Sequence, residues 1–252
     1  FSGMEDLKKK VIRCVGNPTE RFTEDALRIL RAVRFSAQLG FDIEEQTYQS
    51  VADMASTLKK ISRERIQAEL DKLLMSDHPD RVTLLFDTDI INTVFENCKE
   101  CETCGTVQEL SDKLVAASRD HFVRWALFIS FLPYDGVLRS LKFDNRTINV
   151  CGKMKKFKDE PLGTDKALVR HLIVKLGRDI FRDQYLVYRN LLNAPQELVN
   201  QMQNVFDEII ENNECLSLKT LAVNGQDLMA AGVESGAQLG QILNELFEMV
   251  LN

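Results

Sequence analysis

The segment RFTEDALRILRAVRF, residues 21–35, restricts the possible fold more than any other part of the sequence. Apolar residues recur at helical spacing within and just after it, and they cover two adjoining faces of the expected helix. They are Ala26, Leu27, Ile29, Leu30, Val33 and Ala37. A helix with so much apolar surface is buried on most sides, so the pattern predicts a rigid helix that exposes only a stripe of charged residues.

Thr23 is the expected N-cap of this helix, because a threonine oxygen can accept a hydrogen bond from a free backbone N–H group. Glu24 and Asp25 would then lie in the first turn, where the helix dipole favours negative charge.

The charged stripe contains a pair that is suited to reading a nucleobase. Asp25 and Arg28 are three residues apart and are neighbours on a helix. A carboxylate only accepts hydrogen bonds and a guanidinium only donates them. Cytosine and adenine present an amino donor beside a ring-nitrogen acceptor, so the pair is complementary to both. Guanine and uracil present the reverse order and would leave buried polar groups unpaired.

Further charged residues extend the stripe. Arg31 and Arg34 follow at steps of three and could hold phosphate groups, and Glu24 stands four residues before Arg28 and could brace it. The alternative is an ordinary solvated face with pairs inside one helix.

A second helix is expected to begin after Ser62, with Ile61 and Ile66 packed across its start as a hydrophobic staple. Its first turn contains Glu64 and Arg65. By spacing alone these two residues could belong to a capped surface turn.

Composition points to an ordinary globular protein, because 44% of the 252 residues are hydrophobic and 28% are charged. The chain has no apolar run near the length of about 18 residues that a membrane helix needs, so we expect no membrane partner and a cytoplasmic location. Six cysteines without a secretory signal are expected to be reduced.

Charge is unevenly distributed along the chain, whose net charge is −6. Residues 1–75 contain 13 basic and 12 acidic residues, whereas residues 76–252 contain 19 basic and 26 acidic residues. The acidic second part argues against broad, sequence-blind RNA binding there.

Three segments, 1–41, 61–74 and 218–251, resemble the class II tRNA nucleotidyltransferases, or CCA-adding enzymes, and the related bacterial poly(A) polymerases. The resemblance implies a mainly α, elongated, multi-lobed fold with a small β remnant of the palm at the N-terminus. Its expected parts are a head remnant (1–16), a neck (17–76), a helical body (77–194) and a tRNA-binding tail (195–252). The stretch Leu7–Val15 would be the last palm strand.

The same resemblance implies roles for individual residues. Asp25 and Arg28 would read the incoming base, Glu24 would orient Arg28, and Arg31 and Arg34 would contact the nucleotide. The expected supporting residues also include Arg21, Glu64 and Arg65.

The implied reaction adds C, C and A to the tRNA 3′ end from CTP and ATP with Mg²⁺, and the tRNA elbow is a second expected contact. The metal-binding aspartates would belong to a palm that this chain mostly lacks, so we expect neither a catalytic residue nor a metal site here, and an inactive chain on its own. Asp87-Thr88-Asp89 is expected to be a loop or cap. The alternatives are a noncatalytic helical RNA-binding or scaffold module, and a poly(A) polymerase fragment. The sequence does not predict an oligomeric state.

Two features of the expected body suggest metal chemistry but do not complete a site. Cys98, Cys101 and Cys104 lack a fourth ligand at short spacing. The stretch 123–148 resembles a helical phosphohydrolase domain of the HD type, but Ser130 and Phe131 stand where its metal ligands would be. We therefore expect a helical shell whose core contains the aromatic residues Trp125, Phe128 and Phe131.

In the expected tail, Asn224-Gly225 predicts a turn. Gly232, Gly236 and Gly240 would either let backbone amides approach an RNA phosphate or allow tight helix packing.

Overall fold

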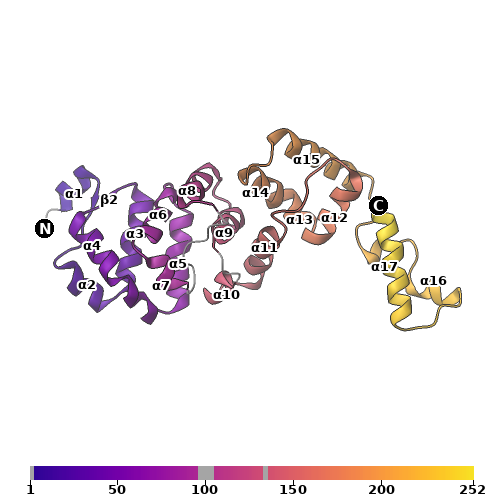
Figure 1. Ribbon diagram of the computed structural model, residues 1–252, viewed down its shortest axis with the longest axis horizontal. Coiled ribbons are helices and arrows are strands. Elements are labelled where there is room, and N and C mark those ends of the chain that lie inside the picture. The colour runs from indigo at the N-terminus through magenta and orange to yellow at the C-terminus, as the bar shows by residue number, and fades with distance from the viewer. Residues whose placement is uncertain (1–2, 96–104, 133–135) are drawn as a thin grey trace. The chain divides into compact units, whose positions relative to one another are not determined.

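The computed structural model describes residues 3–95, 105–132 and 136–252, coloured along the chain in Figure 1. Over these ranges the chain is mainly helical with two short strands, which confirms the predicted fold class. The chain separates into two compact units, residues 1–156 and 157–252. The predicted boundaries of head, neck, body and tail remain predictions. None of the helices in the described ranges is long and apolar enough to cross a membrane.

The first unit begins with helix α1 (Gly3–Lys9) and strand β1 (Val11–Ile12). This strand pairs in parallel with β2 (Asp42–Ile43). The predicted strand over residues 7–15 was therefore too long. Its first three residues complete α1, and the left-handed backbone of Lys10, at φ 56°, separates helix from strand.

The charged segment forms two helices, α2 (Pro18–Glu24) and α3 (Leu27–Leu39), and not the single predicted helix. Asn17 caps α2 by accepting hydrogen bonds from the backbone N–H groups of Thr19 and Glu20, and Pro18 suits the first helical position. The prediction of Thr23 as an N-cap was wrong, because the Asn17-Pro18 pair starts the helix earlier. Gly40, at φ 65°, ends α3.

Helix α3 packs against α5 (Arg63–Leu74), after α4 (Glu45–Met54) and the 3-10 helix η1 (Ala55–Lys60). Both α3 and α5 bury their apolar faces. The buried apolar residues of the two helices include Ile29, Leu30, Val33, Ile66, Leu70 and Leu73. Helix α5 starts after Ser62 as predicted, although the Ser62 side chain makes no capping bond.

Short helices follow in the first unit: η2 (Pro79–Val82), α6 (Thr83–Asp87) and α7 (Ile90–Val94). Asp87-Thr88-Asp89 joins α6 to α7, and Asp89 has a left-handed backbone at φ 58°, so the predicted loop or cap is confirmed. Cys98, Cys101 and Cys104 lie outside the described residues.

The unit ends with α8 (Val107–Ala116), α9 (His121–Ser130), α10 (Val137–Ser140) and α11 (Asn145–Lys156). Trp125 and Phe128 are fully buried, as predicted, whereas Phe131 is half-buried. The Ser130 hydroxyl donates to the Ala126 carbonyl within α9. Arg124 donates to four backbone carbonyls, those of Leu74, Ser76, Ala117 and Ser118. It thereby ties the end of α5 to α9.

The second unit contains α12 (Lys166–Leu176), α13 (Arg178–Ile180), the π-helix η3 (Phe181–Tyr185), α14 (Leu186–Leu191) and α15 (Gln196–Glu211). Helix α15 packs against α12 and α14. The unit ends with η4 (Leu218–Thr220), α16 (Gly225–Ala230) and α17 (Ala237–Leu251). Asn224 forms a capping box with Asp227 at the start of α16, at the predicted turn.

Asp71 joins α5 to α9 through two hydrogen bonds. It accepts from the Trp125 indole at 2.9 Å, and His121 Nδ1 lies 3.1 Å from the same oxygen. Burial alone would raise the pKa of the Asp71 carboxyl, but the bonds from His121 and Trp125 lower it below its usual value.

We expect Asp71→Asn to lower the free energy of unfolding by about 1–2 kcal/mol at neutral pH. Because the native pKa is lowered, this stabilisation is present above the ordinary carboxyl pKa and is lost as the pH falls through the native value. The difference between wild type and variant should therefore be smaller at an acidic pH below the native pKa of Asp71 than at neutral pH. Urea unfolding followed by fluorescence of the single tryptophan measures it. The exposed Asp53→Asn is the control, and an equal difference at both pH values would contradict the assignment.

Candidate functional site

A cavity of about 280 Å³ lies where the end of β1 meets α2, α3 and α4. Its polar lining is dominated by guanidinium groups, and Phe22, Ala32 and Phe35 give it an apolar side. The arginines that line it are Arg13, Arg21, Arg28 and Arg31. Four cations around a small cavity favour an anionic ligand, and the apolar wall can accept a flat ring.

Glu24 fixes two of these arginines. One of its oxygens, Oε2, accepts from Arg28 at 2.6 Å and from Arg21 at 2.7 Å. Arg28 also donates to the backbone carbonyl of Arg21 at 2.9 Å. The hydrogen bond from Arg28 holds the pKa of Glu24 below its usual value. The contact between Glu24 and Arg28 that the sequence suggested is thus present, although it spans the break between α2 and α3 and does not lie within one continuous helix.

Asp25 lies at the break between α2 and α3. Its Oδ1 accepts from the backbone N–H of Leu27 at 3.1 Å, and its Oδ2 accepts from Arg65 at 3.0 Å. Burial would raise the pKa of Asp25, but the Leu27 N–H and Arg65 together lower it. The carboxylate is thus held charged and oriented, and each oxygen keeps a further lone pair for a ligand.

The side chains of Asp25 and Arg28 have separate partners. Arg28 bonds to Glu24 and to the Arg21 carbonyl, whereas Asp25 bonds to Arg65. Arg28 lines the cavity, and Asp25 is not among the residues that line it. The structure therefore brings Arg21, Arg28 and Arg31 together and leaves Asp25 beside them at the helix junction.

Arg34 points elsewhere. Its guanidinium bonds to Glu69 at 2.5 Å, and both side chains are only 10% exposed. It also bonds to Gln38 and lies 3.9 Å from the centre of the Phe35 ring. Each step of three residues turns a helix by about 300°, which falls short of a full turn. Arg34 is two such steps from Arg28, so the two side chains lie on different faces of α3. The predicted contact of Arg34 with a nucleotide is not supported by this geometry.

The two predicted supporting residues of α5 also differ from each other. Arg65 contacts Asp25, whereas Glu64 is an exposed residue of the first turn of α5.

Sequence reasoning missed Glu69 as a partner. The available signal was an acidic residue at position 69 on the helical face of Ile66, Leu70 and Leu73, where a buried charge needs a counterion. Reasoning from the charged stripe also missed Cys14 and Phe35, which line the cavity, because they come from an adjoining loop and from the far end of the stripe.

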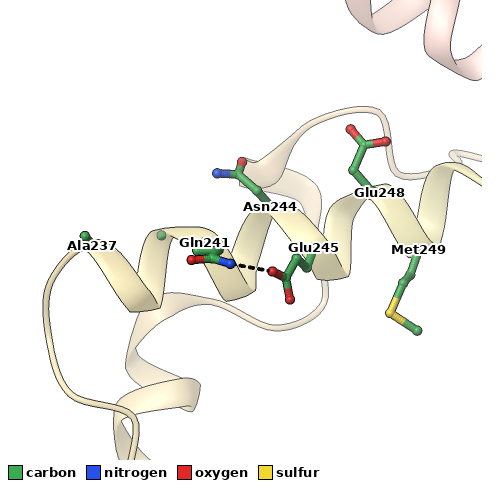
Figure 2. A pocket seen from close by; sticks show the side chains of 7 residues that line it. Ala237, Gln241, Asn244, Glu245, Glu248 and Met249 are labelled. Carbon is green, nitrogen blue, oxygen red and sulfur yellow. Dashed lines mark hydrogen bonds between the residues drawn. The ribbon is translucent and has the colours of Figure 1, made fainter.

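A second cavity, of about 750 Å³, lies along one face of α17 (Figure 2). Figure 2 shows Glu245, Glu248 and Met249 on this face, with Gln241 donating to Glu245 at 2.8 Å. The lining contains two carboxylates and no cation. A phosphate group would be repelled there, so the arginine-lined cavity is the better candidate for a nucleotide.

The described residues do not fit a Mg²⁺ site. The D-x-D sequence at Asp87-Thr88-Asp89 is the obvious candidate, but Asp89 accepts from Asn92 and the Thr88 hydroxyl donates to the Leu84 carbonyl. In the described ranges, no group of three or more His, Cys, Asp or Glu side chains is placed to hold a metal ion.

Two family models match the chain. One, described as "Probable RNA and SrmB- binding site of polymerase A", matches residues 40–101. The other, described as "tRNA nucleotidyltransferase domain 2 putative", matches residues 118–252, which is more than half of the chain.

Individual relatives agree with these models. The chain is 33% identical to the CCA-adding enzyme of Levilactobacillus brevis over 255 residues, covering 98% of the chain and 61% of the relative. It is also 33% identical to the CCA-adding enzyme of Streptococcus sanguinis over 263 residues, covering 100% of the chain and 62% of the relative. The chain thus spans about three fifths of the length of these relatives.

The fold resembles that of a solved relative. The crystal structure of the Bacillus stearothermophilus CCA-adding enzyme in complex with CTP matches with a TM-score of 0.78 at 24% identity. The match covers 100% of this chain and 63% of that protein. At this identity the comparison establishes the fold alone.

We expect Arg34→Met to lower the free energy of unfolding by about 3–5 kcal/mol, because it leaves the Glu69 carboxylate buried without a counterion. Arg31→Met, at an exposed position of the same helix, should change it by less than about 0.5 kcal/mol. Urea unfolding measures both variants. An Arg34→Met protein that is as stable as Arg31→Met would contradict a structural role for Arg34.

Proposed function

Because the chain belongs to the tRNA nucleotidyltransferase family of the CCA-adding enzymes, we propose that it selects the nucleotide and binds tRNA in such an enzyme. The whole enzyme would add C, C and A to the 3′ end of tRNA from CTP and ATP. We further propose that the carboxylates for the metal belong to the part of the relatives that the chain does not span. The chain alone would then bind nucleotides without transferring them.

The observation that carries the proposal is the fixed position of the Arg28 guanidinium at the cavity. Glu24 and the Arg21 carbonyl share one of its nitrogens, Nη1, so its Nη2 and Nε groups keep donors for a ligand. Arg65 and the Leu27 N–H hold Asp25 beside it as a charged acceptor. Since these partners orient both groups before the ligand arrives, little conformational entropy is lost on binding.

The proposed reading of the base follows from these two groups. Arg28 donates to the ring nitrogen of cytosine or adenine, and Asp25 accepts from the exocyclic amino group. Guanine and uracil would set a ring N–H against the guanidinium and a carbonyl against the carboxylate, and both contacts are repulsive. A base with the right order of donor and acceptor is therefore selected without a nucleic-acid template.

The remaining arginines of the cavity would hold the triphosphate. Arg21 and Arg31 line the same cavity as Arg28, and Arg31 is exposed. Charge-assisted bonds to phosphate do not depend on the base, so they provide affinity for every nucleotide.

A second candidate function has one observation in its favour. The family model for an RNA-binding site of polymerase A matches residues 40–101, which include α4 and α5. The chain could then be a helical RNA-binding module without nucleotide selection. Asp25 and Arg65 would serve only to join the α2–α3 junction to α5, and Arg28 only to join α3 to α2.

Titration of the 252-residue chain with each of the four nucleoside triphosphates distinguishes these functions. We expect CTP and ATP to bind more tightly than GTP and UTP, and Arg28→Ala to reduce this preference to about twofold or less. A bidentate guanidinium contact to a base gives about 1–3 kcal/mol of discrimination, or roughly 5- to 150-fold.

Arg31→Ala is the matched control, because it removes one guanidinium from the same cavity. It should weaken the binding of all four nucleotides by a similar factor and leave their order unchanged. A wild-type chain that binds the four equally, or an Arg28→Ala chain that keeps the full preference, would contradict base selection at this site.

A further inference from the structure

An aromatic ring without an assigned role stands at the arginine-lined cavity. Phe35 lines this cavity, and the residue is 36% exposed. In the ranges that the structure describes, every other phenylalanine, tyrosine and tryptophan is buried or half-buried. A single exposed apolar side chain is ordinary on a protein surface, but Phe35 combines its exposure with a place at a candidate ligand site.

The Phe35 ring is held on one side by a guanidinium. The Cζ atom of Arg34 lies 3.9 Å from the centre of the ring, within the range of a cation–π contact. Arg34 is itself fixed by Glu69 at 2.5 Å and by Gln38, and its side chain is only 10% exposed. The ring is therefore held in place before a ligand arrives, and little conformational entropy is lost when a ligand binds to it.

The ring surface that Arg34 leaves uncovered is open to a ligand. Arg31 is the other cation near the ring, and its Cζ atom lies 5.9 Å from the ring centre, at the outer limit of a cation–π contact. Because Arg31 is also exposed, it does not seal the ring from the cavity.

Phe35 shares a stripe of α3 with the arginine that is proposed to read the base. Arg28, Ala32 and Phe35 are spaced by four and three residues, and all three line the cavity. Of the two aromatic rings in the lining, Phe22 is only 2% exposed, so Phe35 offers the accessible ring surface.

The size of the cavity restricts how a base can lie in it. Its volume of about 280 Å³ is at the lower end of the range of ligand pockets, about 300–1,000 Å³. A base whose edge meets Arg28 therefore has its flat faces close to the apolar side of the cavity. Phe35 is on that side.

We propose that Phe35 stacks on the base of the bound nucleotide, with the ring surface that Arg34 leaves open. The inference rests on the proposed function, because it concerns the same nucleotide. The edge of the base meets Arg28 and Asp25, which select it, and its face meets Phe35. Every base has a π-face, so stacking adds affinity for all four nucleotides without choosing among them.

The chemistry of the ring favours the base over the other parts of a nucleotide. The face of a phenyl ring is electron-rich and repels phosphate oxygens, which are attracted to the guanidinium groups of Arg21 and Arg31. The ribose offers hydroxyl groups, and the Phe35 side chain has no donor or acceptor for them. A flat base loses no hydrogen bond when its face covers the ring.

The test measures binding of the four nucleoside triphosphates, and of inorganic tripolyphosphate, to the 252-residue chain. We expect Phe35→Leu to weaken the binding of CTP and ATP about fivefold or more, with the larger loss for ATP because adenine has the larger π-face. Tripolyphosphate has no base, so its affinity should stay within twofold of wild type. A ring that only supported the packing of α3 would, on its removal, weaken tripolyphosphate and nucleotides alike.

The matched control is Leu39→Ala. Leu39 lies one helical turn after Phe35 on α3 and is 49% exposed. It lines a neighbouring cavity of about 440 Å³ together with Phe35, but it is not among the residues that line the arginine-lined cavity. CTP affinity should stay within twofold of wild type in this variant. Phe35→Tyr keeps the ring and should also bind CTP within twofold of wild type. Circular dichroism checks that each variant is folded.

A second variant detects stacking without relying on affinity. Phe35→Trp introduces an indole at the cavity, whereas the single native tryptophan, Trp125, is fully buried. CTP and ATP should quench the emission of the introduced indole, because a stacked base is in direct contact with it. Tripolyphosphate should leave the emission unchanged.

Three results would overturn the stacking contact. They are equal CTP affinity of Phe35→Leu and wild type, a loss in Phe35→Leu that is as large for tripolyphosphate as for CTP, and a loss of CTP affinity in Leu39→Ala as large as in Phe35→Leu. Emission of Phe35→Trp that saturating CTP does not quench would also overturn it.

The same titrations separate this inference from the proposed function. Equal binding of the four triphosphates by wild type, with a loss specific to nucleotides in Phe35→Leu, would refute base selection and retain stacking. A preference for CTP and ATP with unaltered affinities in Phe35→Leu would do the reverse. A wild-type chain that binds none of the triphosphates would overturn both.

Discussion

The packing of α3 against α5 is the constraint on which the candidate site depends. The two helices share a buried apolar contact and the ion pair of Arg34 with Glu69 at 2.5 Å, and Asp25, at the junction before α3, pairs with Arg65 of α5 at 3.0 Å. The apolar contact supplies most of the stability, because exposed ion pairs contribute little and buried pairs are costly to desolvate. The ion pairs instead define how the charged residues at the start of α3 are placed.

The break between α2 and α3 gives Asp25 and Arg28 separate partners. On a continuous helix Asp25 and Arg28 would be expected to pair with each other, which would neutralise both. In the structure Glu24 pairs with Arg28 and Arg65 pairs with Asp25. Asp25 and Arg28 therefore do not pair with each other. The Asp25 carboxylate and the Arg28 guanidinium, each held by its own partner, are available to a ligand that offers one donor and one acceptor.

The sequence predicted the elements with strong periodicity and missed those set by local geometry. The apolar repeat placed α3 and α5 correctly, and the spacing of Glu24 and Arg28 predicted their contact. The helix break at Asp25 was missed, because the apolar pattern continues through it.

Arg34 shows why a stripe of arginines is an incomplete guide. Its spacing from Arg31 equals that of Arg31 from Arg28, yet its environment is set by Glu69, which is 35 residues away in sequence. Long-range partners of this kind depend on tertiary packing, and one sequence contains only indirect signals for them.

The most direct measurement of the central claim is an NMR titration of the ¹⁵N-arginine-labelled chain with CTP, observing the guanidinium N–H signals. We expect the Arg28 signals to shift at the nitrogens that are not bonded to Glu24, while the signals of Arg34, which is paired with Glu69, stay unchanged. The same shifts should be weaker or absent with GTP. A titration in which Arg28 does not respond to CTP, or responds equally to CTP and GTP, would contradict the account.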